Sequence, residues 1–510
     1  MSELLEVDTA ALPLSRFQNI ITADQYRRLM AVVSEAERVF AGRTIWNVNS
    51  TASGGGVAEM LRSLIGYIKG INLDARWLVI PGNAEFFRVT KRIHNHLHGA
   101  AGDGGRLDDA ARETYEGTLK PTAQALAARV RPGDIVVLHD PQTAGLIPAI
   151  RKVTPFVVWR CHVGLDLPND LAREAWRFLL PYVTEAQVYV FSRADFAWEG
   201  LERSKIWVIP PSIDAFSPKN RDLSLEQVQS ILTVAGIVNG GSTSNLTKSA
   251  ILQGPQTSNP TKSAISQGPQ TSSAQFERSD GTVAEVLHRA EMVEDSRASL
   301  TDRLVVQVSR WDQLKDPVGV IRGFAEHVAP YCNAHLIVAG PAVEAVADDP
   351  EGRQVLEDSV RAREALAPSV RPSVHLSVLP MVDSEENAVL VNALQRQATV
   401  VVQKSLAEGF GLTVAEAMWK GRPVVASRIG GIQDQIDDGR TGLLLNDPRD
   451  LAEYGRAVRR LLEDPALASK IGEAAREKVR NHFLGPRHLM QYAELFQQFL
   501  ATPRTSQQPD

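Results

Sequence analysis

The sequence predicts an α/β protein made of two halves of similar size, each with a mostly parallel sheet wrapped by helices. Short apolar runs that end in polar or turn residues alternate with helical patterns along most of the chain. This pattern occurs twice, on either side of a central stretch rich in Ser, Thr, Gln, Gly and Pro. Ligands of open α/β sheets bind beyond the carboxyl ends of the strands, so we expect a cleft shared by the two halves.

The expected strands come in two sets of six, and most helices lie between them. In the first half they are 44–50, 75–82, 134–140, 156–162, 187–192 and 205–211. In the second half they are 303–312, 334–340, 374–380, 398–405, 423–427 and 441–445. We therefore expect an N-terminal domain over 1–215 and a C-terminal domain over 300–485, followed by a helix over 486–501.

Composition excludes several classes of protein. The chain has 510 residues, a net charge of −5 and two cysteines, Cys161 and Cys332. A basic nucleic-acid footprint is missing from this composition, and two distant cysteines favour neither a disulfide framework nor a Cys-rich metal site. The sequence shows neither a basic-then-apolar leader nor a run of about 20 apolar residues. We expect a cytoplasmic protein that contacts neither membrane nor nucleic acid.

A short repeat separates the two halves. TKSAILQGPQTS (247–258) recurs as TKSAISQGPQTS (261–272). Both units are polar and have few large apolar side chains, so they bury too little surface to offset the entropy of ordering. We predict a disordered insertion over roughly 240–280.

Two groups at strand ends are suited to binding an anion. Gly54, Gly55 and Gly56 follow the first strand and open a helix, where backbone amides come close to a ligand. The same glycines would also serve a tight strand-to-helix turn. Arg310 and Lys315 follow the strand at 303–312. They are either solvated surface charges or a clamp on a diphosphate, and their place at a strand end favours the clamp.

Glu408 and Glu416 lie eight residues apart around a Gly-Phe-Gly turn. Glu408 lies in a loop and has no evident structural role, which makes it the stronger candidate for contacting a ligand. Thr413 and Glu416 match the Thr-x-x-Glu capping box, so we expect Glu416 to cap a helix at least in part. Its other interpretation is a contact to a ribose or sugar hydroxyl.

His162 and the pair His139–Asp140 follow two strands of the first half, at the expected edge of the cleft. An imidazole and a carboxylate there would hold sugar hydroxyls, although a buried structural histidine is the alternative for His162. The alternating histidines of HNHLH (94–98) lack accompanying Cys or acidic residues, so no metal site is predicted. There is no G-x-S-x-G elbow or other nucleophile motif.

These motifs together resemble a known family. EGFGLTVAEAM (408–418) resembles the Glu-x7-Glu signature of retaining glycosyltransferases of the GT-B fold, the group that includes glycogen, sucrose and trehalose synthases. SRWDQLKDP (309–317) resembles the Arg…Lys diphosphate clamp of that group, and GRPVVASRIGGIQDQIDDGRTGLLL (421–445) resembles the segment that closes its donor domain. WVIPPSIDAFSP (207–218) looks like the exit from the acceptor domain, with Ser212 where the family commonly has Gly.

Within that group, four segments resemble the branch of trehalose synthase (glycosyltransferring) and trehalose phosphorylase. They are WNVNSTASGGGVAEML (46–61), RIHNHLHG (92–99), VLHDPQTAGLIP (137–148) and WRCHVGLD (159–166). The resemblance covers nearly the whole chain except the insertion and the ends. It implies the GT-B fold, in which two Rossmann-like domains face a central cleft and the last helix crosses back onto the N-terminal domain.

The resemblance also implies roles for individual residues. The acceptor would bind the N-terminal domain and a nucleoside-diphosphate glucose the C-terminal domain. Four residues would carry the chemistry: Arg310, Lys315, Glu408 and His162. The nucleotide would meet Gly55, Gly56, Met381, Val382, Gly411, Leu412, Thr413 and Glu416, with Met381 and Val382 at the nucleobase. The sugars would meet Asp140, His162 and Glu408.

The resemblance favours a retaining glucosyltransferase that joins glucose from a nucleotide sugar to free glucose, giving α,α-trehalose. A trehalose phosphorylase is the first alternative, a nucleotide-sugar epimerase a weaker one, and a non-catalytic sensor the weakest. No metal or other cofactor would be required, with Mg²⁺ at most stimulatory, because Arg310 and Lys315 supply positive charge. The sequence does not fix the base of the nucleotide. It does not fix the oligomeric state either, for which a homodimer is one candidate.

Overall fold

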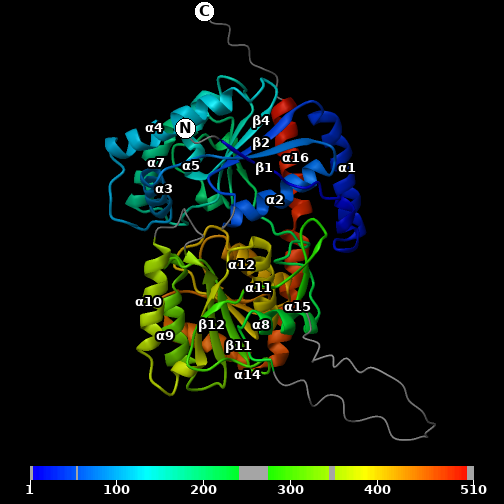
Figure 1. The fold of residues 1–510 in the computed structure, drawn as a ribbon. Coiled ribbons are helices and arrows are strands. Elements are labelled where there is room, and N and C mark those ends of the chain that lie inside the picture. Colours follow the sequence, from blue (N-terminus) through cyan, green and yellow to red (C-terminus); the bar gives the residue numbers. More distant parts are fainter. Residues whose placement is uncertain (1–3, 53–54, 241–273, 344–350, 502–510) are drawn as a thin grey trace, which may run out of the picture.

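The computed structural model describes residues 4–52, 55–240, 274–343 and 351–501. Figure 1 shows two lobes stacked on each other, each with a sheet covered by helices on both faces. The N-terminal half of the chain forms one lobe, and most of the C-terminal half forms the other. The predicted α/β class is therefore confirmed.

The sheet of the N-terminal lobe has seven strands in the order β1-β3-β2-β4-β5-β6-β7. All pairs are parallel except β1–β3. The strands are β1 (Leu5–Val7), β2 (Thr44–Asn49), β3 (Asp74–Val79), β4 (Ile135–His139), β5 (Val157–Cys161), β6 (Val188–Phe191) and β7 (Ile206–Val208). Six of them confirm the predicted strands, and β1 is an unpredicted antiparallel edge.

The helices of this lobe connect and cover the strands. They are α1 (Ala23–Phe40), α2 (Gly56–Lys69), α3 (Ala84–Leu97), α4 (Asp109–Ala127), α5 (Asp140–Thr143), α6 (Ile147–Ile150) and α7 (Asp170–Val183). Short 3-10 turns are η1 (Leu14–Asn19), η2 (Ala144–Leu146), η3 (Ala194–Phe196) and η4 (Arg203–Lys205).

The sheet of the C-terminal lobe also has seven strands, in the order β10-β13-β12-β11-β14-β15-β16, and only β10 is antiparallel; its third parallel strand, β13, lies on the other side of the first strand from the position that β4 takes in the N-terminal sheet. The strands are β10 (Glu291–Val293), β11 (Leu304–Val308), β12 (His335–Pro341), β13 (Val374–Leu379), β14 (Val400–Gln403), β15 (Val424–Ser427) and β16 (Leu443–Leu445). The helices and turns are α8 (Leu225–Val234), η6 (Gln313–Lys315), α9 (Pro317–His327), α10 (Gly352–Glu364), η8 (Arg371–Ser373), α11 (Ser384–Gln397), α12 (Leu412–Trp419), α13 (Ile432–Gln435), α14 (Leu451–Glu463) and α15 (Pro465–His482). All six predicted strands are present, and β10 was not predicted.

The predicted disordered insertion at 240–280 and its repeat fall mostly on residues 241–273, which lie outside the described ranges. Its last residues are described and contain β8 (Gln275–Glu277), which pairs with β9 (Val283–Glu285). The sequence prediction therefore set the end of the insertion a few residues too late.

The last helix, α16 (Gly485–Ala501), returns to the N-terminal lobe, where it lies beside α1 (Figure 1). Phe496 meets Phe40 of α1 edge to face, with ring centroids 6.0 Å apart. At the start of α16, His488 Nδ1 is 2.8 Å from Ser212 Oγ. The Ser at a position where the resembled family commonly has Gly thus binds the returning helix.

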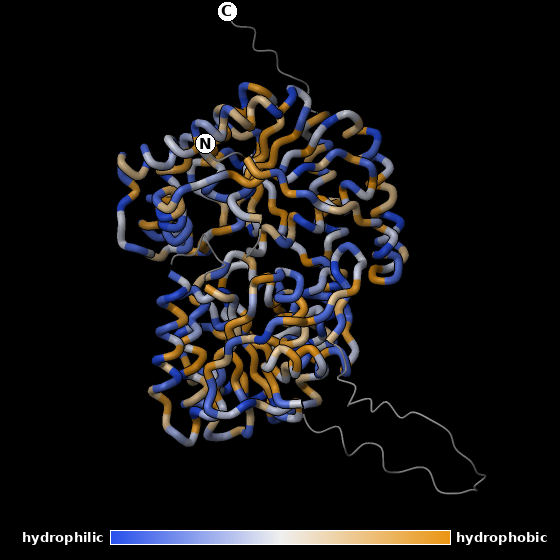
Figure 2. The backbone as a smooth tube through the Cα atoms, viewed as in Figure 1, coloured by the Kyte–Doolittle hydropathy of each residue, from blue (hydrophilic) through white to orange (hydrophobic). Residues whose placement is uncertain are grey.

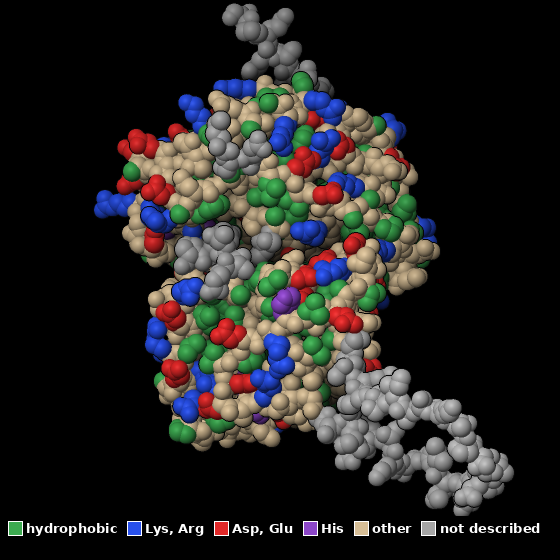
Figure 3. Space-filling view, in the orientation of Figure 1, with side chains coloured by type: hydrophobic (Ala, Val, Ile, Leu, Met, Phe, Trp, Pro, Cys, Tyr) green, Lys and Arg blue, Asp and Glu red, His purple; other side chains and the backbone are tan. Residues whose placement is uncertain are grey.

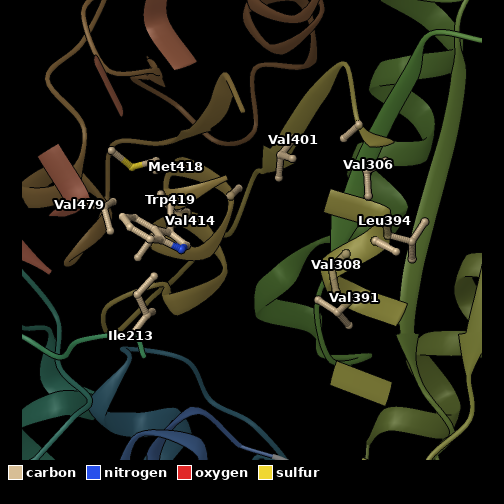
Figure 4. Packing of buried hydrophobic residues seen from close by; sticks show 14 of the residues in the cluster. Ile213, Val306, Val308, Val391, Leu394, Val401, Val414, Met418, Trp419 and Val479 are labelled. Atoms are coloured by element: carbon tan, nitrogen blue, oxygen red, sulfur yellow. The ribbon is translucent and has the colours of Figure 1, made fainter. Parts of the chain in front are cut away.

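Apolar residues fill both lobes and continue between them. The strands are the most hydrophobic segments of each lobe (Figure 2), as expected for parallel strands buried on both faces. One cluster joins Phe17 and Tyr67 of the N-terminal lobe to Val414 and Trp419 of α12. Figure 4 shows Ile213 pointing at Val414 and Trp419 from the segment that connects the lobes.

Side chains of both charges are spread over the two lobes in the view of Figure 3. Among the helices that the structure describes, none combines the length and apolarity needed to cross a membrane.

Candidate active site

A cavity of about 410 Å³ lies between the lobes, at the carboxyl ends of both sheets. Eleven of the thirteen predicted site residues line it: Gly55, Gly56, His162, Arg310, Lys315, Met381, Glu408, Gly411, Leu412, Thr413 and Glu416. The two others, Asp140 and Val382, are not among the lining residues. Segments up to 361 residues apart in sequence thus form one site.

Arg310 and Lys315 follow β11 on one loop whose shape is set by Asp312. The Asp312 carboxylate accepts a hydrogen bond of 2.7 Å from the Leu314 amide, which starts the η6 turn. Arg310 Nη2 is 3.8 Å from Asp312 Oδ2, and Lys91 Nζ of α3 is 3.5 Å from the same oxygen. Although burial acts the other way, Lys91, Lys315 and Arg310 lower the pKa of Asp312. The cavity wall is cationic here and suits a phosphate group.

Glu408 lies on the loop after β14 and is paired with Lys315. Glu408 Oε2 is 2.6 Å from Lys315 Nζ and 3.4 Å from Ser405 Oγ. The next residue must be small, because a Cβ added at Gly409 would lie 2.5 Å from the carbonyl oxygen of His162. The glutamate loop of the C-terminal lobe thus packs directly on the backbone of the N-terminal lobe.

A second contact between the lobes lies beside this loop. The Gly430 amide donates a hydrogen bond of 3.0 Å to Asp166 Oδ2, and Gln433 Nε2 donates one of 2.8 Å to the same oxygen. Arg193 Nη1 donates to the Gly430 carbonyl. Gly430 itself has φ +47° and lies against the Glu408 carbonyl. The segment after β15 therefore holds the glutamate loop against the N-terminal lobe.

The expected capping box at Thr413–Glu416 is not formed. Helix α12 begins at Leu412, and its N-cap is Gly411 with φ +84° and no side-chain capping bond. A glycine tolerates this left-handed conformation. Gly411 therefore takes the N-cap position that the capping box would give to Thr413. Thr413 and Glu416 both lie inside the helix and line the cavity instead.

Glu416 is buried with one carboxylate oxygen unpaired. The residue is 2% exposed, and Oε2 has no hydrogen-bond partner among the described residues. Oε1 is 3.8 Å from Lys219 Nζ. Burial raises the pKa of this carboxyl, and Lys219 opposes the shift. An unpaired buried acceptor at a cavity wall is suited to a ligand hydroxyl, because leaving it unsatisfied costs about 1–3 kcal/mol.

His162 takes the predicted place at the cavity, whereas Asp140 does not line it. His162 lines the cavity, with Nε2 3.2 Å from Nδ1 of His139. Asp140 lies behind it, where Oδ1 accepts a 2.7 Å hydrogen bond from the His162 amide. Asp140 has φ +63°, and burial raises its pKa to about 7. The prediction of a direct sugar contact is not matched, because this carboxylate is turned onto the backbone of His162.

The predicted nucleobase edge is split. Met381 lines the cavity, but Val382 is 81% exposed and faces away from it. The chain bends at Val382, between the end of β13 and the start of α11.

The glycine turn of the N-terminal lobe meets α12 across the cavity. Gly55 is the N-cap of α2, and a Cβ on Gly56 would lie 2.5 Å from Leu412 Cδ1. Gly54 lies outside the described residues.

Two histidines that line the cavity were not predicted as site residues: His94 in helix α3, and His98, which is the C-cap of that helix. His94 and His98 both line the cavity, with ring centroids 4.9 Å apart. His98 Nδ1 is 3.1 Å from the Gly164 carbonyl, which can only accept, so Nδ1 carries the proton and Nε2 is an acceptor. Burial, helped by Lys315, lowers the pKa of His98 to about 4. The only signal was the HNHLH run, which was weighed for metal. The described residues contain no group of three or more His, Cys, Asp or Glu suited to a metal ion.

The fold and this site define a two-domain GT-B glycosyltransferase. Residues 288–478 match the family described as "Glycosyl transferases group 1", and residues 47–198 match "Trehalose synthase, N-terminal domain". The α,α-trehalose-phosphate synthase (UDP-forming) of Burkholderia xenovorans has the same fold, with a TM-score of 0.59 at 15% identity over 90% of this chain and 100% of that one.

The trehalose synthase of Pyrococcus horikoshii is 31% identical over 97% of this chain and 98% of its own length. The chain therefore belongs to the trehalose synthase family. The trehalose phosphorylase of Pleurotus sajor-caju is more distant, at 27% identity over 85% of this chain and 55% of that protein.

Proposed function

We propose that this protein transfers glucose from a nucleoside-diphosphate glucose to free glucose, with retention at the anomeric carbon, to give α,α-trehalose. The observation that carries the proposal is the Glu416 carboxylate at the cavity wall, whose buried Oε2 has no hydrogen-bond partner among the described residues. A ribose offers two neighbouring hydroxyl donors to such an oxygen. A phosphorylase, which uses inorganic phosphate, has no group to place there.

The remaining cavity residues fit the rest of such a donor. Arg310 and Lys315 are cations at the end of β11, next to the start of α12, where backbone amides favour an anion. We assign the diphosphate to this wall. Glu408, held 2.6 Å from Lys315, is then placed to grip hydroxyls of the transferred glucose. Gly55 and Gly56 approach the phosphates from the other lobe.

The acceptor glucose would bind the N-terminal lobe. His98 offers a neutral acceptor nitrogen, and His162 lies in the same cavity beside the Gly409 backbone. Neutral imidazoles suit an uncharged sugar. Met381 is assigned to the nucleobase.

In the reaction, the bond from the glucose anomeric carbon to the diphosphate breaks, and a bond to the anomeric oxygen of the acceptor forms on the same face. The acceptor proton passes to the departing phosphate oxygen. Arg310 and Lys315 stabilise the negative charge that develops on the diphosphate, and the two lobes hold the acceptor on the face from which the diphosphate departs. These two cations supply the charge that Mg²⁺ supplies elsewhere, so we expect activity in the presence of a chelator.

The proposal is tested by incubating the protein with glucose and, in separate tubes, the glucose conjugates of UDP, ADP and GDP, each with EDTA. A parallel tube contains glucose and glucose 1-phosphate. Trehalose is expected with at least one nucleotide sugar. Trehalose from glucose 1-phosphate alone would instead support the phosphorylase, and a changed sugar on the nucleotide would support the epimerase.

A cytoplasmic location and a homodimer remain predictions, checked by fractionation and by light scattering.

A further inference from the structure

A lysine from the segment between the lobes connects the carboxylate assigned to ribose with the opposite lobe. Lys219 Nζ is 2.5 Å from Glu59 Oε1 and 3.8 Å from Glu416 Oε1. Glu59 lies in the first turn of α2, directly after the Gly55–Gly56 turn. One ammonium group therefore bridges two carboxylates that belong to different lobes.

All three side chains lie at the cavity wall. The Lys219 and Glu416 side chains are only 16% and 3% exposed, whereas Glu59 is 46% exposed, so the half of the bridge that reaches Glu416 is the half shielded from solvent and from salt. Glu416 Oε1 is the oxygen near this lysine, and Oε2 is buried without a hydrogen-bond partner among the described residues. The two oxygens thus divide between the bridge and the ligand.

We propose that Lys219 is a positioning residue for nucleotide binding, which joins Glu59 to Glu416 and keeps the Glu416 carboxylate ionised to accept ribose hydroxyls. The inference rests on the proposed nucleotide donor. It assigns to the interdomain segment a part in donor recognition that none of the sequence motifs indicates.

The charges around Glu416 decide how the bridge depends on pH. Burial raises the pKa of Glu416; Lys219 lowers it, Glu59 raises it, and Lys420 of the same helix lowers it. Burial lowers the pKa of Lys420 to about 7, with Arg396 of α11 adding to that shift, so Lys420 is a weak substitute for Lys219. On the α15 side of α12, the Arg476 guanidinium lies over the Trp419 ring, 5.1 Å from its centroid.

Removing Lys219 would therefore raise the pKa of Glu416 further, and removing the charge of Glu59 would lower it. A protonated Glu416 loses the charge that strengthens its hydrogen bonds to ribose. Removing Lys219 should raise the pH below which nucleotide binding weakens, and removing the charge of Glu59 should lower that pH. A general loss of packing would act in the same direction for both and equally at each pH.

The test measures the affinity of the full-length protein for UDP, ADP and GDP by calorimetry at pH 6.5, 7.5 and 8.5. For the tightest nucleotide we expect K219M to bind about tenfold more weakly than wild type at pH 6.5 and to approach wild type at pH 8.5. K219R should restore most of the affinity, and E59Q should bind at least as tightly as wild type at pH 6.5. The matched control is K205M, whose lysine pairs with Glu202 away from the cavity.

Pyrophosphate, which has no ribose, is the second probe. We expect wild type and K219M to bind it equally, because the bridge acts through Glu416 alone. The inference would be overturned if K219M lost the same nucleotide affinity at every pH, or if it also lost affinity for pyrophosphate. Either result would leave the proposed function intact. Wild-type protein that binds pyrophosphate but none of the three nucleotides would overturn both.

Discussion

Lys315 Nζ lies 2.6 Å from Glu408 Oε2, although 93 residues separate the two in sequence. They come together because β11 and β14 are neighbours in the parallel sheet, so the loops that follow them leave the same edge side by side. Both side chains are mostly buried, at 17% and 11% exposure. In the proposed donor complex, this pair sets a cation for the diphosphate directly beside an acceptor for sugar hydroxyls, where the bond between sugar and phosphate would lie.

Arg310→Ala should lower kcat by about 10²–10³-fold, the usual effect of removing one donor that stabilises developing negative charge. The measurement is the initial rate of trehalose formation at saturating donor. Arg322→Ala, on the exposed face of α9, is the matched control and should leave the rate unchanged. Near-normal turnover of Arg310→Ala would remove Arg310 from the diphosphate clamp.

Glu408→Gln should lower kcat by about 10- to 100-fold, because a charged hydrogen bond to the transferred glucose is replaced by a neutral one. The affinity for the free nucleoside diphosphate should change little, since Glu408 is assigned to the sugar and not to the nucleotide. Rates and calorimetric affinities are compared with those of Glu473→Gln, an exposed glutamate of α15. A loss confined to nucleotide affinity would contradict the assignment.

Gly409→Ala should lower kcat by about 10- to 100-fold, because its Cβ would come within 2.5 Å of the His162 carbonyl oxygen and displace the glutamate loop. Gly117→Ala, in α4, adds a Cβ with no heavy atom within 4 Å and should gain up to about 1 kcal/mol of stability. Steady-state rates and urea unfolding of both variants give the comparison. An active Gly409→Ala enzyme would show that the two lobes do not need this backbone contact.

His98→Gln should make the protein less sensitive to acid. Burial lowers the pKa of folded His98 to about 4, whereas the unfolded residue titrates near 6.5, so below that pH the unfolded chain binds a proton that the folded one does not. Between pH 7 and pH 5, wild type should lose about 2 kcal/mol more unfolding free energy than the variant. Urea unfolding at the two pH values measures this difference. Equal losses would show that His98 is not held neutral.

Sequence patterns predicted the twelve parallel strands because parallel strands that are buried on both faces have continuous apolar sequences. The antiparallel edge strands β1 and β10 escaped prediction, since both are short and each carries a glutamate, in Leu-Glu-Val and Glu-Met-Val. Their positions depend on pairing with distant strands, which no local pattern reveals.

The same limit applies to the site. Residues at strand ends, such as Arg310 and Glu408, were predictable because topology alone brings strand ends together. The capping box failed because Gly411 starts α12 earlier than the Thr-x-x-Glu pattern implies. Lys219 lies outside the quoted motifs, and His98 lies in the HNHLH run, which was interpreted only as a possible metal site; their place in the cavity follows from how the two lobes meet.

The most direct test of the central claim follows the labelled anomeric carbon. The protein is supplied with unlabelled glucose and the accepted nucleotide sugar carrying ¹³C at C1 of glucose, and the product is read by NMR. We expect the label in α,α-trehalose with the α configuration retained, and one nucleoside diphosphate released for each disaccharide. Label that reaches trehalose only through glucose 1-phosphate, with no nucleoside diphosphate released, would contradict a nucleotide donor.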